Sequence, residues 1–166
     1  MDFFNPIYRK EPPRKDSLFG IVDKQDEGFA RTSKEEPPKE WVAVVVNDTK
    51  AMLQFVPVDK NITVGKERGA ERSMCDGMLY KTDKSWLAFI EMKDRTKKDV
   101  GSAMDQLVST IELFLKTRSS KKVGTKYAYV ANRRHPDFSR GMGETKQRFY
   151  NQCGFHLCCK NTIEVK

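Results

Sequence analysis

The sequence lacks the features that mark several large classes of protein. No hydrophobic run is long enough to cross a bilayer, and the N-terminal stretch MDFFNPIYRKEPPRK has no apolar core of signal-peptide length. The four cysteines include no Cys-x-x-Cys pair, so no disulfide framework is indicated and the thiols should be reduced. The sequence therefore predicts a soluble, cytoplasmic protein with no membrane partner.

Histidine is also scarce, with two residues in the chain. Neither lies in a pattern typical of acid–base catalysis. An alternative metal site near the C-terminus has zinc-binding residue types, namely Cys153, His156, Cys158 and Cys159. Zinc ligands usually come as spaced pairs from separate segments, so we expect these cysteines to be buried free thiols instead.

Acidic residues are fewer than basic ones. The chain has 31 Lys and Arg against 23 Asp and Glu, a formal charge of +8 and an isoelectric point near 9.3. This balance favours polyanionic partners such as nucleic acid. The alternative is that the charge serves solubility alone.

The length of 166 residues suits one domain. Residues 1–16 are polar and contain prolines, so we expect a flexible N-terminal arm followed by a single α/β domain over 17–166. The first half of that domain is β-rich. It has predicted strands at 18–23, 40–48 and 51–59, the last two forming a hairpin, and prolines interrupt the connection at 24–39.

The second half alternates strands and helices. A strand pair at 74–80 and 85–93 precedes apolar residues that recur every three or four positions between 99 and 116, which predicts a helix. A strand at 125–132, a short helix at 144–154 and a closing strand or pair follow. A strand–helix–strand crossover makes strands 85–93 and 125–132 parallel. The expected fold class is α/β, with a mixed central β-sheet flanked by helices.

Three charged residues lie on the predicted strand pair. Residues two apart on a strand face the same side, so Glu91 and Lys93 project together, and Asp76 on the preceding strand can bring its carboxylate beside Glu91. Two adjacent carboxylates repel each other unless a cation lies between them, and Mg²⁺ or Mn²⁺ prefers such oxygen ligands. Lys93 would stabilise charge or assist an attacking water.

The order of Asp76, fourteen residues, Glu91-Met92-Lys93 and a helix resembles the PD-(D/E)xK nuclease superfamily, in particular its small RecB-like or Holliday-junction-resolvase-like members. The resemblance covers roughly residues 70–132. It implies a restriction-endonuclease-like fold in which Asp76, Glu91 and the Met92 carbonyl bind Mg²⁺. Lys93 would help to position or activate the attacking water.

Two further positions follow from the resemblance. Gln106, thirteen residues past Lys93, matches the helix glutamine of RecB-like members. The superfamily usually has another acid upstream, for which Glu71 is favoured over Glu67 and Asp59. Cys75 replaces the proline of the superfamily's label.

The tripeptide acid-x-Lys is weak evidence by itself. It occurs four times, at Asp48–Lys50, Glu91–Lys93, Glu144–Lys146 and Glu164–Lys166. Only the second follows an apolar strand and precedes an amphipathic helix. The alternative for this one is an ordinary surface ion pair at a strand end.

Basic residues follow both parallel strands. Arg95, Lys97 and Lys98 come after the first, and Arg133 and Arg134 after the second. Parallel neighbours end at the same edge of a sheet, so we expect the two groups to form a nucleic-acid-binding rim. The alternative is two unrelated solvated turns.

These observations favour an Mg²⁺-dependent endodeoxyribonuclease that hydrolyses phosphodiester bonds, with DNA preferred to RNA as the partner. A chain of this size suggests a homodimer or a protein partner for specificity. One alternative is a noncatalytic nucleic-acid-binding or assembly module with the same fold. Another is a partner-binding protein whose basic charge is incidental.

Overall fold

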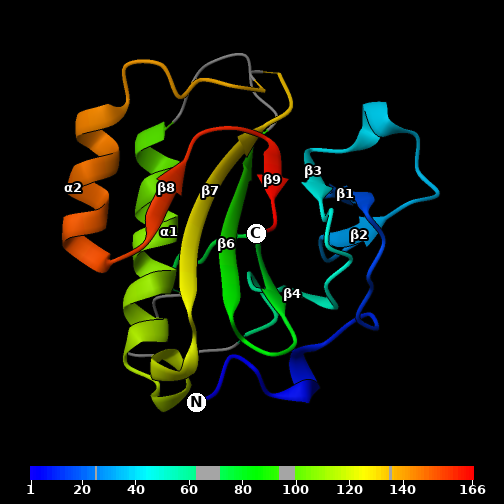
Figure 1. Cartoon of the computed structure of the whole chain (residues 1–166), viewed down its shortest axis with the longest axis horizontal. Helices are drawn as coiled ribbons and strands as arrows, with labels where there is room; N and C mark the ends of the chain where they lie inside the picture. The colour runs from blue at the N-terminus through cyan, green and yellow to red at the C-terminus, as the bar shows by residue number, and fades with distance from the viewer. Residues whose placement is uncertain (25, 63–71, 94–99, 135) are drawn as a thin grey trace.

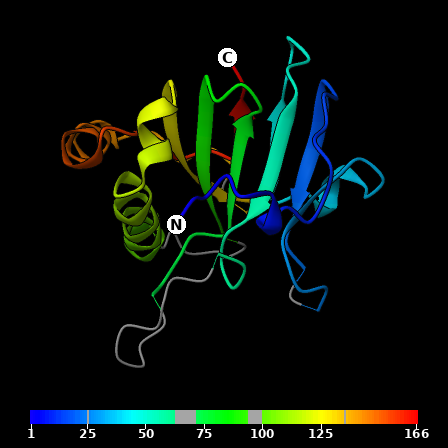
Figure 2. The same cartoon turned by 90° about the horizontal axis from the view of Figure 1, so that it is seen from below.

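The computed structural model describes all residues except 25, 63–71, 94–99 and 135. The described residues form a mixed α/β fold of three layers: two α-helices, a five-stranded sheet and a four-stranded sheet. Figure 2 shows these layers side by side, with the five-stranded sheet in the middle.

The central sheet, sheet A, has the strand order β4-β5-β6-β7-β8. Its strands are β4 (Leu53–Pro57), β5 (Gly77–Lys81), β6 (Trp86–Lys93), β7 (Thr125–Asn132) and β8 (His156–Cys158). β5 pairs antiparallel with both β4 and β6, whereas β6, β7 and β8 run parallel to one another. The predicted strand pair and the parallel crossover from β6 to β7 are therefore confirmed.

The second sheet, sheet B, has the order β2-β1-β3-β9. Its strands are β1 (Leu18–Val22), β2 (Arg31–Ser33), β3 (Ala43–Val46) and β9 (Thr162–Glu164). The closing segment thus supplies one strand to each sheet, since β8 joins sheet A and β9 pairs in parallel with β3.

Two helices pack on one face of sheet A (Figure 1). They are α1 (Val100–Leu115) and α2 (Gly143–Cys153), and short 3₁₀ turns occur at Pro6–Tyr8, Pro38–Glu40 and Arg118–Lys122. Both predicted helices are confirmed. Gly154 ends α2 with a φ of 76°, a left-handed conformation that glycine adopts without strain.

The helix-side core is rich in aromatic rings. Phe114 of α1 lies 5.3 Å from Phe89 of β6 and 5.4 Å from Phe3, centroid to centroid, in edge-to-face contacts. Such contacts fill space and also have favourable quadrupole geometry. Phe89 is therefore on the helix side, and the alternation along β6 puts Glu91 and Lys93 on that side too.

The other face of sheet A packs against sheet B, not against helices. Phe19 and Val45 of sheet B share one core with Leu79, Ala88 and Ile90 of sheet A, and all five are fully buried. The expectation that helices flank the sheet is thus correct for one face, and a second sheet covers the other.

Three local predictions were wrong. The segments 40–48 and 51–59 do not form a hairpin, because β3 and β4 belong to different sheets. Residues 31–33, predicted as part of a connection, form strand β2. The predicted flexible arm is packed: Phe3 and Phe4 are buried, and the backbone of Arg14 exchanges two hydrogen bonds with Leu53.

No helix in the described ranges is both long enough and apolar enough to cross a bilayer.

Candidate functional site

The site begins where β5 starts and β6 ends. Gly77 pairs with Ile90 in the antiparallel register, so Asp76, just before β5, lies opposite Glu91. The Met92 amide donates a hydrogen bond of 2.6 Å to Asp76 Oδ2. The two acids that the sequence predicted to meet are therefore adjacent, and the backbone of β6 fixes the position of one of them.

Glu91 is buried to an unusual degree for a carboxyl group. Its relative exposure is 1%, and its Oε2 atom accepts no hydrogen bond in the structure. Burial raises the pKa of Glu91 to about 10, aided by a hydrogen bond to Asp76 and by the Asp76 charge, while Lys93 lowers it. At neutral pH without a cation, Glu91 therefore keeps its proton.

Lys93 is held by the helix that follows it. Its Nζ atom donates a hydrogen bond of 3.1 Å to Gln106 Oε1, and Gln106 Nε2 donates one of 3.3 Å to the Met74 carbonyl. One turn further along α1, the Thr110 hydroxyl accepts a bond from the Cys75 amide. The segment before Asp76 and the side chain of Lys93 are thus both attached to α1.

Two further acids border the same place. A hollow of about 600 Å³ is lined by Asp23, Asp59 and Asp76, together with Lys60 and an apolar wall that includes Phe29. The Asp59 amide bonds to the Cys75 carbonyl at 3.1 Å, which extends the ladder between β4 and β5 and brings Asp59 beside Asp76. Burial raises the pKa of Asp23, and the charges of Asp76 and Asp59 raise it further.

Asp23 was missed in the sequence, and Asp59 was ranked behind Glu71 as the third acid. Glu71 and Glu67 lie outside the described residues. A usable signal was present, because Asp23 and Asp59 each follow an apolar strand segment directly, as LFGIVD and FVPVD show. Asp59 also raises the pKa of Glu91, so it lies within electrostatic reach of the predicted pair.

The donor set suits a hard divalent cation. Within the described ranges, no group of three or more His, Cys, Asp or Glu side chains is arranged to hold a metal. The predicted set is smaller: two carboxylates and the Met92 carbonyl. Mg²⁺ keeps several waters and needs only one or two carboxylates. The buried Glu91 oxygen without a hydrogen-bond partner fits this chemistry, because a cation would satisfy it.

The zinc alternative does not fit the structure. Cys159 belongs to the helix-side core, whereas Cys158 packs on the sheet-B side, so the two thiols point to opposite faces of β8 and its extension. All four cysteines are free. This agrees with the expectation of reduced thiols that serve mainly as packing groups.

The basic rim is described only in part. Arg95, Lys97 and Lys98 lie outside the described residues. The Arg133 amide donates a bond of 3.2 Å to the Lys93 carbonyl, which places Arg133 at the same sheet edge as the site, as the parallel register predicts. Its guanidinium donates to the Lys39 carbonyl of the loop before β3 at 3.0 Å. Arg134 follows it, and its amide bonds to the Asn132 side chain.

Comparison with protein-family models, with curated proteins and with solved structures found no match for this chain.

Proposed function

We propose that the protein is a metal-dependent nuclease of the restriction-endonuclease-like fold that hydrolyses phosphodiester bonds in DNA. The observation that carries the proposal is the meeting of Asp76 with the buried Glu91 beside a lysine that Gln106 holds in place. A strand-end ion pair in solvent would not need a carboxyl group that is 1% exposed.

Each group has a role that its surroundings support. Asp76, Glu91 and the Met92 carbonyl would hold Mg²⁺ or Mn²⁺. When bound, such an ion polarises a phosphate oxygen and acidifies a coordinated water. The Lys93 ammonium points along the same face as Glu91, so it can orient the attacking water or stabilise the charge that develops on the phosphate. Gln106 is a positioning residue, because its contact is with Lys93.

The path of the chain supports the superfamily resemblance. The motif residues occupy the start of β5 and the end of β6, and α1 then crosses to the parallel strand β7. The glutamine that the resemblance predicted on this helix reaches Lys93 in space, although it stands thirteen positions further along the chain. Sequence spacing alone did not require that contact.

Charge supports a nucleic-acid substrate. The site itself is acidic, with Asp23, Asp59, Asp76 and Glu91 close together, while the chain carries a formal charge of +8. The positive net charge of the chain attracts a polyanion to the protein. A cation bound at the acids would then offset their repulsion of phosphate. Arg133 at the same edge is a candidate phosphate contact.

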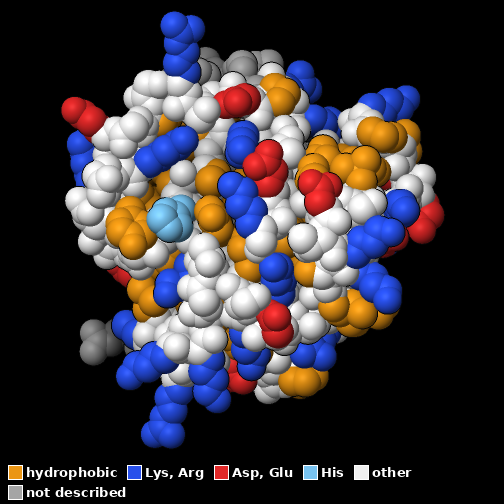
Figure 3. Space-filling model, viewed as in Figure 1, with side chains coloured by type: hydrophobic (Ala, Val, Ile, Leu, Met, Phe, Trp, Pro, Cys, Tyr) orange, Lys and Arg blue, Asp and Glu red, His pale blue; other side chains and the backbone are white. Residues whose placement is uncertain are grey.

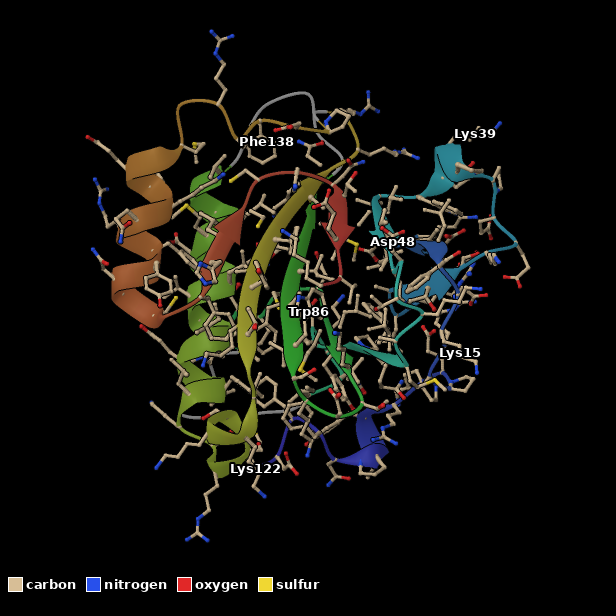
Figure 4. All side chains as sticks on the ribbon, in the orientation of Figure 1. Lys15, Lys39, Asp48, Trp86, Lys122 and Phe138 are labelled. Atoms are coloured by element: carbon tan, nitrogen blue, oxygen red, sulfur yellow. The ribbon has the colours of Figure 1, made fainter. Side chains whose placement is uncertain are left out.

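The test is cleavage of supercoiled plasmid and of branched DNA with Mg²⁺, with Mn²⁺ and with EDTA. Glu91→Ala and Lys93→Ala should each lower the metal-dependent rate by about a hundredfold or more. Asp48→Ala is the matched control, since Asp48 heads another acid-x-Lys tripeptide but is exposed beside sheet B (Figure 4). Equal rates in all four proteins would reject the catalytic assignment and favour the noncatalytic nucleic-acid-binding module.

A further inference from the structure

A row of three residues crosses the sheet-B side of sheet A from interior to surface. Ala88 of β6, Tyr127 of β7 and His156 of β8 are register partners, so they lie side by side on one face. Ala88 is fully buried, Tyr127 is half-buried and His156 is exposed. Sheet B therefore covers the β6 part of this face and leaves the β8 edge open.

The limit of the cover is marked by β9, the edge strand of sheet B. Tyr129 of β7, which is 2% exposed, belongs to the same buried core as Ile163 of β9. Two residues earlier on β7, Tyr127 is already partly open to solvent. Among the described residues, no strand of sheet B covers the strip of aromatic side chains beyond β9.

We call this strip the ring platform: Tyr127, His156 and Tyr150 of α2. The His156 ring stacks on Tyr150 with centroids 4.8 Å apart and planes 25° apart, and Tyr127 lies 5.4 Å from His156. Tyr127 in turn lies 6.0 Å from Trp86, which is 1% exposed. The column of rings thus starts in the core, at the Trp86 labelled in Figure 4, and ends at Tyr150, which is 43% exposed.

The column of rings is anchored on a buried side chain, Trp86, and this anchoring makes the outer rings rigid. A ring already held by its neighbours loses little conformational freedom when another planar group stacks on it, so the cost of binding is low. The platform also borders a hollow of about 470 Å³, lined by Tyr150, His156, Lys146, Gln147 and Leu157 along with Gly143. The rings of Tyr150 and His156 are therefore accessible from this hollow.

One lysine borders the platform directly, because Lys146 lines the hollow. Lys160 follows Cys158 by two residues, and both lysines lower the pKa of Cys158, so both lie within electrostatic reach of β8. Glu164 lies 4.0 Å from Lys160 and offsets one of these charges. Figure 3 shows the histidine of this face beside hydrophobic side chains, with several Lys or Arg side chains around them. Exposed rings with adjacent cations are complementary to bases joined by phosphates.

We infer that the ring platform binds single-stranded nucleic acid, with an unpaired base stacked on Tyr150 at the outer end of the column and the neighbouring phosphates at Lys146 and Lys160. A duplex does not present the faces of its bases, so the ligand must be unpaired there. The charge around the rings disfavours a second copy of this basic chain as the occupant.

The platform is separate from the proposed catalytic site. Glu91 and Lys93 face the helix side of sheet A, whereas Tyr127 and His156 face the side of sheet B. Binding to the platform involves neither the acids nor a metal ion. The test of this inference therefore does not depend on the proposed nuclease activity.

The test is fluorescence anisotropy with a labelled oligothymidylate of about 20 nucleotides in EDTA, which prevents any metal-dependent cleavage. Tyr150→Ala should weaken binding about tenfold, whereas Tyr150→Phe, which keeps the ring, should stay within about twofold of the wild type. Lys146→Ala should weaken binding and reduce the slope of log affinity against log salt by about one. A blunt duplex of the same length should show no effect of Tyr150→Ala.

Met52→Ala is the matched control, because Met52 is exposed to a similar degree, 40%, but lies between β3 and β4 and lines neither the hollow beside the platform nor the acidic hollow. It should bind the oligonucleotide as the wild type does. Three results would overturn the inference: no binding by the wild-type protein at low salt, equal affinity of wild type and Tyr150→Ala, or an equal loss in the Met52→Ala control. Concentration-dependent dimerisation that Tyr150→Ala abolishes, with oligonucleotide affinity unchanged, would assign the surface to self-association instead.

Discussion

The Asp76 carboxylate accepts a 2.6 Å hydrogen bond from the backbone amide of Met92, one residue past Glu91. This bond joins the start of β5 to the end of β6 and holds the Asp76 carboxylate beside Glu91. A main-chain donor cannot rotate away as a side chain can. The position of Asp76 is thus set by the sheet, as a preorganised site requires.

Asp76→Asn should lower metal-dependent cleavage while leaving the stability of the fold nearly unchanged. The asparagine oxygen can still accept from Met92, so the free energy of unfolding should change by less than about 1 kcal/mol. The negative charge is lost, so metal-dependent cleavage should fall by about a hundredfold or more. Asp76→Ala removes the acceptor as well and should cost about 1.5 to 3 kcal/mol in urea unfolding. Full activity of the asparagine variant would argue against a metal-binding role for Asp76.

Gln106→Leu tests the positioning of Lys93. The substitution keeps much of the side-chain volume and removes both the bond to Lys93 and the bond to the Met74 carbonyl. We expect kcat for DNA cleavage to fall about tenfold with little change in KM, because binding is left intact while the ammonium loses its orientation. Asp105→Ala, the exposed neighbour on α1, is the control. An effect on KM alone would mean that Gln106 contributes to DNA binding and does not position Lys93.

The part of the fold that carries the motif could be predicted because residues close together in the sequence determine its helices, strands and turns. The period change at α1, the strand-pair turn and Gly154 at the end of α2 are all visible in the sequence. The meeting of Asp76 with Glu91 followed from a short antiparallel register. These features depend on residues near one another in the chain, for which periodicity and turn chemistry are informative.

The errors arose where distant segments decide the outcome. β3 and β4 look like a hairpin, but β3 instead pairs with β1 and with β9 at the far end of the chain. Asp23 joins the acids only because sheet B packs on sheet A, which strand patterns do not reveal. The packed N-terminal segment had one visible signal, the adjacent Phe3 and Phe4 in an otherwise polar stretch.

Gly20→Ala should destabilise the contact between sheet B and the Trp41 loop. A Cβ atom at Gly20 would overlap the Trp41 ring, which is 7% exposed and anchored by its Nε1 bond to the Glu36 carbonyl. Forcing that ring to move should cost about 1 to 3 kcal/mol in thermal or urea unfolding. Gly101→Ala is the matched control, because a Cβ there meets nothing within 4 Å and alanine is a better helix former. Gly101→Ala should leave stability unchanged or raise it by up to about 1 kcal/mol.

The raised pKa of Glu91 predicts how stability varies with pH. In the unfolded chain this carboxyl ionises near its usual pKa of 4.5, whereas in the folded protein without metal it keeps its proton up to about 10. The folded state then binds more protons between these values, so the free energy of unfolding should fall as pH rises through this window. In EDTA, the Tm of the wild type should therefore drop between pH 5 and pH 8. Glu91→Gln, which has no proton to lose, should show a smaller drop, and identical pH profiles for the two proteins would contradict the assignment.

Addition of a divalent cation should reverse that loss, and it should do so through Glu91. A metal ion needs the ionised carboxylate, so Mg²⁺ must displace the proton of Glu91, and its apparent affinity should rise with pH. Differential scanning fluorimetry of the wild type with 10 mM Mg²⁺, roughly a saturating level for such sites, should show a larger increase in Tm at pH 8 than at pH 6. Glu91→Gln should show little increase at either pH, while Asp48→Ala should respond as the wild type does. An equal increase in all three proteins would place the cation elsewhere on the chain.

Calorimetry in two buffers of different ionisation enthalpy provides an independent check, since binding at Glu91 must release a proton and binding at a surface carboxylate with its usual pKa would not.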